Sequence, residues 1–125
     1  MRLKVASLLL VSILLASMVP TSIGYSNGKY SSGSSGCSCH GYSSATVSMS
    51  GQPSSYTPGT TYTLQITVST GSGNGGFSLD ANKGTLTTGG GVGIMSVKVN
   101  SAGNSATHTT NSYRSWSVDW IAPSS

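Results

Sequence analysis

The feature that most constrains this chain is a two-residue alternation of apolar and polar side chains. It is longest in the segment TYTLQITV at 61–68, where an apolar residue follows each polar one. Shorter copies of the pattern place apolar side chains at Val47 and Met49, at Phe77, Leu79 and Ala81, at Met95, Val97 and Val99, and at Trp116, Val118 and Trp120. A period of two is typical of a β-strand with one buried face. Because turn-forming Gly, Pro and Asn residues separate these segments, the sequence predicts an all-β, antiparallel β-sandwich.

The same alternation predicts the core. We expect it to contain Val47, Tyr62, Leu64, Ile66, Phe77, Leu79, Val97, Trp116, Val118 and Trp120. Core packing is the first interpretation of the two tryptophans, and carbohydrate binding by a row of exposed rings is the alternative. The sandwich domain is expected to span 42–123 and to lack a last strand. Such a sandwich exposes a long strand edge, so either the chain is a fragment or a partner strand completes the sheet.

The first 24 residues have the order of a secretory signal peptide. Arg2 and Lys4 precede an apolar run, and small residues follow it. We expect cleavage after Gly24, which makes Tyr25 the first residue of the mature chain. The apolar run is shorter than the ~20 residues of a membrane-spanning helix, which argues against an uncleaved anchor. The sequence therefore predicts a protein that is secreted or held at the cell surface, with no transmembrane span in the mature chain.

Residues 25–36 are rich in Gly and Ser, and we expect them to form a flexible leader. After cleavage the charged side chains are Lys29, Lys83, Lys98 and Arg114 against Asp80 and Asp119. These scattered charges lack the basic patch of a nucleic-acid-binding protein. The chain has no Glu and two distant aspartates, so it offers no good carboxylate pair for glycoside hydrolysis. We expect no enzymatic activity.

The one reactive cluster is CSCHG at 37–41, which has three interpretations. In the first, Cys37 and Cys39 hold a c-type haem covalently and His40 is the proximal iron ligand, as in the longer motif C-x-x-C-H. In the second, the same three side chains and a distant histidine bind zinc through two thiolates and two imidazoles. In the third, the cysteines are structural and form a disulfide within or between chains. A bridge across one intervening residue would close a small, strained ring.

A six-coordinate haem needs a second axial ligand, and His108 is the expected one. It is the other histidine of the chain and lies in the segment ATHTT at 106–110. Met49 and Met95 are the remaining candidates. A histidine in such a Thr-rich segment is more often solvated surface. With His108 as ligand, the haem iron would be held between His40 and His108.

Four segments together resemble a known family. They are GCSCHG at 36–41, SGQPSSYTPGTTYTLQITVS at 50–69, GGFSLDANKGTL at 75–86 and THTTNSYRSWSVDWIAP at 107–123. Over about 33–123 the chain is similar to the prokaryotic Reeler-like domain, also called the choice-of-anchor V domain. The resemblance implies an exported, immunoglobulin-like β-sandwich that often opens with a C-x-x-C-H-G or shortened C-x-C-H-G element and is held at the surface by an anchor. This chain departs from the family by ending after W-x-A-P, where a last strand usually follows.

Two functions of different classes remain open. The first is an exported electron carrier whose c-type haem exchanges electrons with a redox partner. The alternative is a non-catalytic surface or adhesion module that contacts a neighbouring surface protein and whose cysteines are structural or bind zinc. Covalently bound haem is the property that separates the two.

Overall fold

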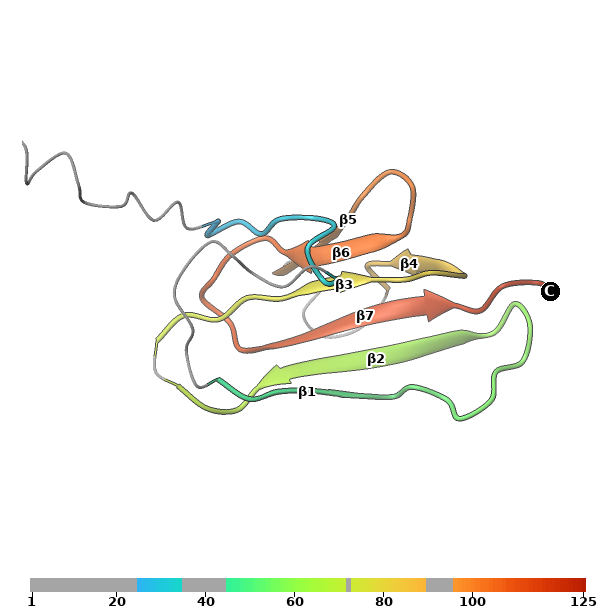
Figure 1. Cartoon of the computed structure of the whole chain (residues 1–125), viewed down its shortest axis with the longest axis horizontal. Coiled ribbons are helices and arrows are strands. Elements are labelled where there is room, and N and C mark those ends of the chain that lie inside the picture. Colours follow the sequence, from blue (N-terminus) through green and yellow to red (C-terminus); the bar gives the residue numbers. More distant parts are fainter. Residues whose placement is uncertain (1–24, 35–44, 72, 90–95) are drawn as a thin grey trace, which may run out of the picture.

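The computed structural model describes residues 25–34, 45–71, 73–89 and 96–125. They form two antiparallel β-sheets that lie face to face (Figure 1). The first sheet has the order β1 (Val47–Ser50), β2 (Thr61–Val68), β7 (Ser115–Ile121) and β4 (Thr85–Thr87). The second has the order β3 (Ser78–Asp80), β6 (Ser105–His108) and β5 (Val97–Val99). The predicted all-β, immunoglobulin-like sandwich is confirmed. The expected signal peptide lies outside the described residues.

The pairing of β2 with β7 shows why the alternation produces a sandwich. Leu64 lies opposite Val118 and Ile66 opposite Trp116, and all four side chains are buried between the sheets. The residues between them face the other way. There, Gln65 accepts a hydrogen bond from Ser117 at 2.8 Å on the outer face of the sheet. Cross-strand pairs thus place apolar side chains on one face of the sheet and polar side chains on the other.

The core contains most of the residues that the alternation predicts. Among the predicted ten, the buried ones are Leu64, Ile66, Phe77, Val97, Trp116 and Val118. Tyr62, Leu79 and Trp120 are half-buried. The buried residues that were not predicted are Val68, Leu86, Ala106 and Ala122. Because Trp116 is only 1% exposed, the two tryptophans do not form a row of exposed rings, and core packing is the correct interpretation for Trp116.

The prediction that Val47 belongs to the core is wrong. Its side chain is 61% exposed, and all four residues of β1 are exposed. The register places Val47 opposite Val68, which shows that it does face inward as the alternation predicts. β1, however, is the edge strand of the first sheet. Among the described residues no strand of the second sheet covers it, so an inward-facing side chain at this edge stays exposed.

Two strands do not follow from the alternation. They are β4 and β6, which have three and four residues. Every residue of β6 is buried, although its sequence is SATH. Small polar residues can be buried here because their hydroxyl groups find partners: Thr107 donates to the carbonyl of Phe77 at 2.7 Å. Such partners come from distant parts of the chain and leave no local sequence pattern.

Residues 25–34 lie along the second sheet instead of extending freely from it (Figure 1). The amide of Ser31 donates to Oγ of Ser105 at 2.8 Å, and the amide of Gly33 donates to Oδ2 of Asp80 at 2.9 Å. The Gly- and Ser-rich composition predicted a flexible leader. The composition does not reveal this arrangement, because the side chains that accept these hydrogen bonds belong to β3 and β6, far from residues 25–34 in the sequence.

Candidate functional site

The three residues of the predicted haem element, Cys37, Cys39 and His40, lie outside the described residues. The chain on both sides of them is described. Before the element, Gly33 is bonded to the side chain of Asp80 in β3. After it, the amide of Thr46 donates to Oγ1 of Thr70 at 2.6 Å, just before β1 begins. The described residues that flank the element thus contact β3 on one side and precede β1 on the other.

His108 is buried at the end of β6, with 8% of its surface exposed. Its ring packs against Phe77 and Trp116, with ring centroids 6.3 Å from each, and those two rings also contact each other at 5.1 Å. It is therefore not the solvated residue that is usual for a histidine in a Thr-rich segment. Gly76 makes room for it, because a Cβ at that position would lie 2.4 Å from Cε1 of the imidazole.

Both ring nitrogens of His108 face backbone groups. The amide of Phe77 donates to Nδ1 at 3.1 Å, and Nε2 lies 3.2 Å from the carbonyl oxygen of Tyr25. Nδ1 also lies 3.2 Å from the carbonyl oxygen of Phe77, so both backbone groups of Phe77 are within hydrogen-bond distance of this nitrogen. An iron ligated through Nε2 would have to displace the Tyr25 carbonyl. The prediction that His108 is an axial ligand therefore requires the backbone at Tyr25 to move.

The other candidate ligands are placed as follows. Met49 lies on β1 and is 37% exposed, and Met95 is outside the described residues. Within the described ranges, no three His, Cys, Asp or Glu side chains are close enough to hold a metal ion. The zinc prediction thus depends on residues beyond these ranges.

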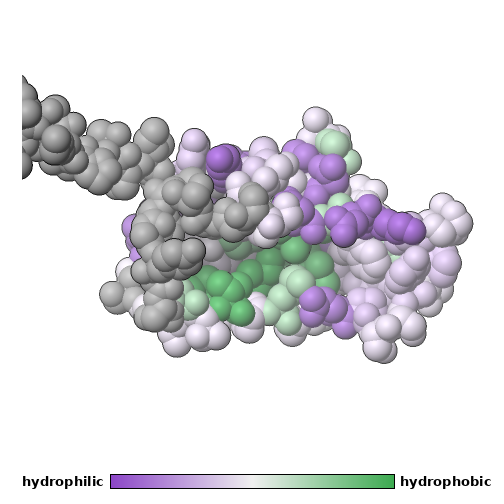
Figure 2. Space-filling model, in the orientation of Figure 1, coloured by the Kyte–Doolittle hydropathy of each residue, from purple (hydrophilic) through white to green (hydrophobic). Residues whose placement is uncertain are grey.

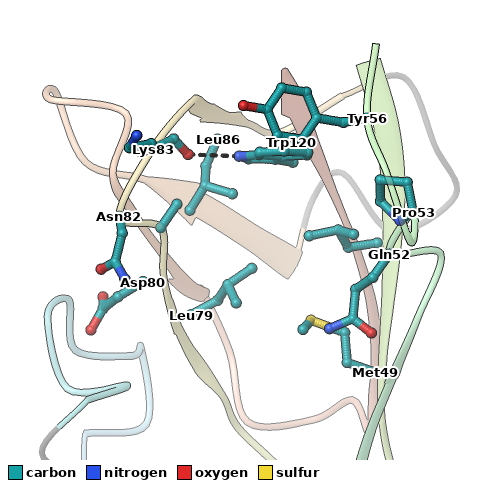
Figure 3. Close-up of a pocket in the computed structure, with 12 residues that line it drawn as sticks. Met49, Gln52, Pro53, Tyr56, Leu79, Asp80, Asn82, Lys83, Leu86 and Trp120 are labelled. Carbon is teal, nitrogen blue, oxygen red and sulfur yellow. Dashed lines mark hydrogen bonds between the residues drawn. The ribbon is translucent and has the colours of Figure 1, made fainter. Parts of the chain in front are cut away.

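In the described part of the chain, an apolar groove of about 330 Å³ lies between the two sheets. Its main apolar lining residues are Met49, Leu64, Leu79, Leu86 and Trp120. Figure 2 shows this apolar surface in the hollow between the sheets, and Figure 3 shows the side chains around it. We call it the β1–β3 groove, because Met49 of β1 and Leu79 of β3 lie on its two sides.

Aromatic contacts and one hydrogen bond hold Trp120 at the wall of the β1–β3 groove. The ring of Tyr56 meets it edge to face at 5.5 Å, and the ring of Tyr62 lies 5.9 Å away. Its Nε1 donates to the carbonyl of Lys83 at 2.8 Å (Figure 3). Gly84 leaves space for this bond, because a Cβ there would lie 2.5 Å from Nε1. The wall is thus preorganised and does not need to form on binding.

Sequence reasoning did not predict the β1–β3 groove. Leu86 comes from β4, a strand that the alternation does not reveal, and Gln52 and Pro53 come from the loop before β2. The alternation does place Met49 on the inner face of its strand, but the edge position of β1, which leaves this face open, follows only from the strand order.

Comparisons with known proteins give similarity of fold. No protein-family model matches the chain, and no curated protein matches its sequence. The crystal structure of the human F-spondin reeler domain is similar with a TM-score of 0.45 and 22% identity, over 78% of this chain and 71% of that one. The structure of the Reelin-N domain of F-spondin is similar with a TM-score of 0.46 and 23% identity, over 67% and 66%. At these identities the likeness concerns the fold alone. In the described ranges, no helix is long and apolar enough to cross a membrane.

Proposed function

We propose that this chain is an exported, non-catalytic β-sandwich module that binds a neighbouring protein at the cell surface. The observation that carries the proposal is the preformed, apolar β1–β3 groove beside the edge strands of both sheets. Apolar surface of this kind on a folded domain marks a site of interaction.

The polar groups of the sandwich support this proposal because their contacts are structural. Asp80 accepts hydrogen bonds from Ser105 at 2.7 Å and from the amide of Gly33 at 2.9 Å. Asp119 accepts a hydrogen bond from Thr63 at 2.7 Å on the outer face of the first sheet. Each carboxylate thus links neighbouring segments of the fold, which leaves binding through the groove as the best-supported role.

Export is tested by the amino terminus of the protein from its natural source. The charged, apolar and small-residue order of 1–24 predicts a mature chain that begins at Tyr25. Amino-terminal sequencing and intact mass of the extracellular or surface fraction check this directly. Met1 retained in that fraction would contradict the proposal.

A covalently bound c-type haem is the second candidate, and the order Cys37, Cys39, His40 favours it. The two thiols would hold the group through thioether bonds, and His40 would supply an axial ligand. The group would supply one-electron chemistry to a redox partner. The zinc and disulfide interpretations use the same residues and exclude this one.

The haem candidate is tested on protein from its natural source. We expect the mass of one haem that survives denaturation and acid–acetone extraction. A Cys37–Cys39 bridge or bound zinc without haem would reject electron transfer and leave the binding module.

If haem is attached, the variant His108→Ala tests the second axial ligand. A change in the low-spin spectrum is expected if His108 ligates the iron, and Tyr113→Ala, at an exposed position, is the matched control. An unchanged spectrum would remove His108 from the site. This outcome agrees with its contacts to Phe77 and Tyr25.

A further inference from the structure

The edge strand β1 has a row of backbone groups that point away from its neighbour β2. In the part of the chain that the structure describes, β2 is the strand that pairs with β1. The amide of Val68 in β2 donates to the carbonyl of Arg114 at 2.8 Å, on the side of β7, so it does not bond its β1 neighbour Val47. Bonded and non-bonded pairs alternate along an antiparallel ladder. Ser48 therefore bonds to β2, whereas the N–H and C=O groups of Val47 and Met49 point away from it.

The side chains of Val47 and Met49 are apolar and open to solvent. Their pairing with buried residues of β2 turns both toward the inner face of the first sheet. They are nevertheless 61% and 37% exposed, and Ser48 and Ser50 on the outer face are exposed as well. β1 is thus open to solvent on both faces, and burying its apolar row would be favourable.

β1 also lacks the charged residues found at the other edges of the sandwich. Charged side chains and proline usually protect edge strands from pairing with another chain. β3 contains Asp80, β5 contains Lys98, and Lys83 lies just before β4. In contrast, the sequence from 30 to 79 contains no Asp, Glu, Lys or Arg. Two copies of the chain can therefore approach each other along β1 without like-charge repulsion.

The sequence of β1 is complementary to itself. When two antiparallel copies of β1 place Ser48 opposite Ser48, Val47 of each copy lies opposite Met49 of the other. These are the residues whose backbone groups point outward, so each such pair can exchange both N–H···O bonds. Their side chains share the inner face, so apolar side chains meet across the new pair of strands. A twofold axis requires this kind of self-complementarity.

We propose that two copies of this chain pair antiparallel through β1, around a twofold axis at Ser48. The two four-stranded sheets then form one continuous sheet, and Val47 and Met49 of both copies pack in one row along its inner face. Because the paired strands are short, we expect an interface below the ~1,200 Å² of standard complexes and therefore a weak dimer that forms at high local concentration. This goes beyond the proposed function and does not rest on it.

Hydrogen exchange read by NMR tests which backbone groups pair. The mature protein is measured at about 50 µM and at about 1 mM, which bracket a weak complex, with a reductant present so that cysteines cannot link two copies. The amides of Val47 and Met49 should exchange about twofold or more slower at the higher concentration. The amide of Ser48 should change little, because it is already bonded to β2.

Charges placed on the twofold axis test the symmetry of the dimer. Ser48→Lys and Ser48→Asp each put like charges opposite each other, and each should weaken self-association in sedimentation equilibrium by about tenfold. An equimolar mixture of the two variants should restore it, because opposite charges then face each other. Thr85→Lys adds the same charge on β4, at the other edge of the sheet, and should leave self-association within about twofold of wild type. Both positions are exposed, so the variants should fold.

Three results would overturn the proposal. In the first, the sedimenting mass stays that of one copy up to about 1 mM. In the second, the amides of Val47 and Met49 are already protected in dilute protein, which would show that this edge pairs within the chain. In the third, the equimolar mixture associates no better than either variant alone, which would show that the copies meet elsewhere. None of these results affects the export and haem tests, so the failure of this inference is distinguishable from that of the proposed function.

Discussion

The backbone amide of Phe77 donates a hydrogen bond to Nδ1 of His108 over 3.1 Å, and this bond fixes the imidazole at the end of the sandwich. On the other side of the ring, Nε2 meets the carbonyl of Tyr25 at 3.2 Å. One buried side chain thus connects Tyr25 to the segment before β3. These contacts of His108 stabilise the fold whether or not its imidazole also binds a cofactor.

Removing this imidazole should destabilise the protein. His108→Ala leaves the amide of Phe77 without its partner and creates a cavity beside Trp116, which should cost about 2–4 kcal/mol in the free energy of unfolding. Urea unfolding followed by tryptophan fluorescence measures the loss. Tyr113→Ala removes a side chain that is 53% exposed and should change stability by less than about 0.5 kcal/mol. Equal midpoints for the two variants would show that the His108 contacts contribute little.

Truncation of the two predicted core residues Trp116 and Val47 should lower the free energy of unfolding by very different amounts. Trp116→Ala removes a side chain that is 1% exposed and should cost about 3–5 kcal/mol, whereas Val47→Ala should cost less than about 0.5 kcal/mol. Trp116→Phe should cost less than Trp116→Ala, because Nε1 has no hydrogen-bond partner in the described part of the chain and the replacement ring refills most of the space. Thermal melts rank the three variants. A large loss for Val47→Ala would mean that this edge is covered in solution.

Residues 25–34 should be released when their contact with β6 is blocked. At Gly28, which has a φ of +76°, a Cβ would lie 2.2 Å from the carbonyl oxygen of His108 and 2.4 Å from Oγ1 of Thr107. Gly28→Val therefore cannot keep this approach. We expect trypsin to cleave after Lys29 about tenfold faster than in the wild-type protein, because cleavage requires the segment to open. Ser26→Val, at an exposed position, is the control. An unchanged rate would show that the segment is already free.

The guanidinium group of Arg114 should stabilise the backbone at the end of β2 and in the loop that follows it. It donates to the carbonyls of Val68 and Gly73, each at 3.2 Å, and to that of Thr70. Arg114→Lys keeps the charge but cannot serve all three acceptors, so we expect a loss of about 1–2 kcal/mol. Chemical denaturation measures it, and Lys83→Arg, at an exposed position, is the reverse exchange and should have almost no effect. If Arg114→Lys is neutral, the charge alone is sufficient.

The sequence predicted β2 and β7 well because their information is local. Eight residues of strict alternation in β2 specify both the strand and its buried face, and Leu64 and Ile66 are buried as predicted. For Val47 the same rule predicted the correct face but the wrong burial. Whether an inward side chain is covered depends on the strand of the opposite sheet, and no pattern around Val47 contains that information.

The all-β class and the alternation in β2 and β7 were thus determined by the sequence itself, because a side-chain period of two is a property of neighbouring residues. The tertiary structure alone decided the burial of His108, the position of residues 25–34 and the β1–β3 groove. His108 is buried because Tyr25, 83 positions away, supplies a carbonyl. The groove exists because Met49, Leu79 and Trp120 come together from three strands of two sheets. Such sites depend on how the strands are ordered and packed. That order is set by hydrogen bonds and apolar contacts between residues far apart in the sequence, and these contacts form only when the chain folds.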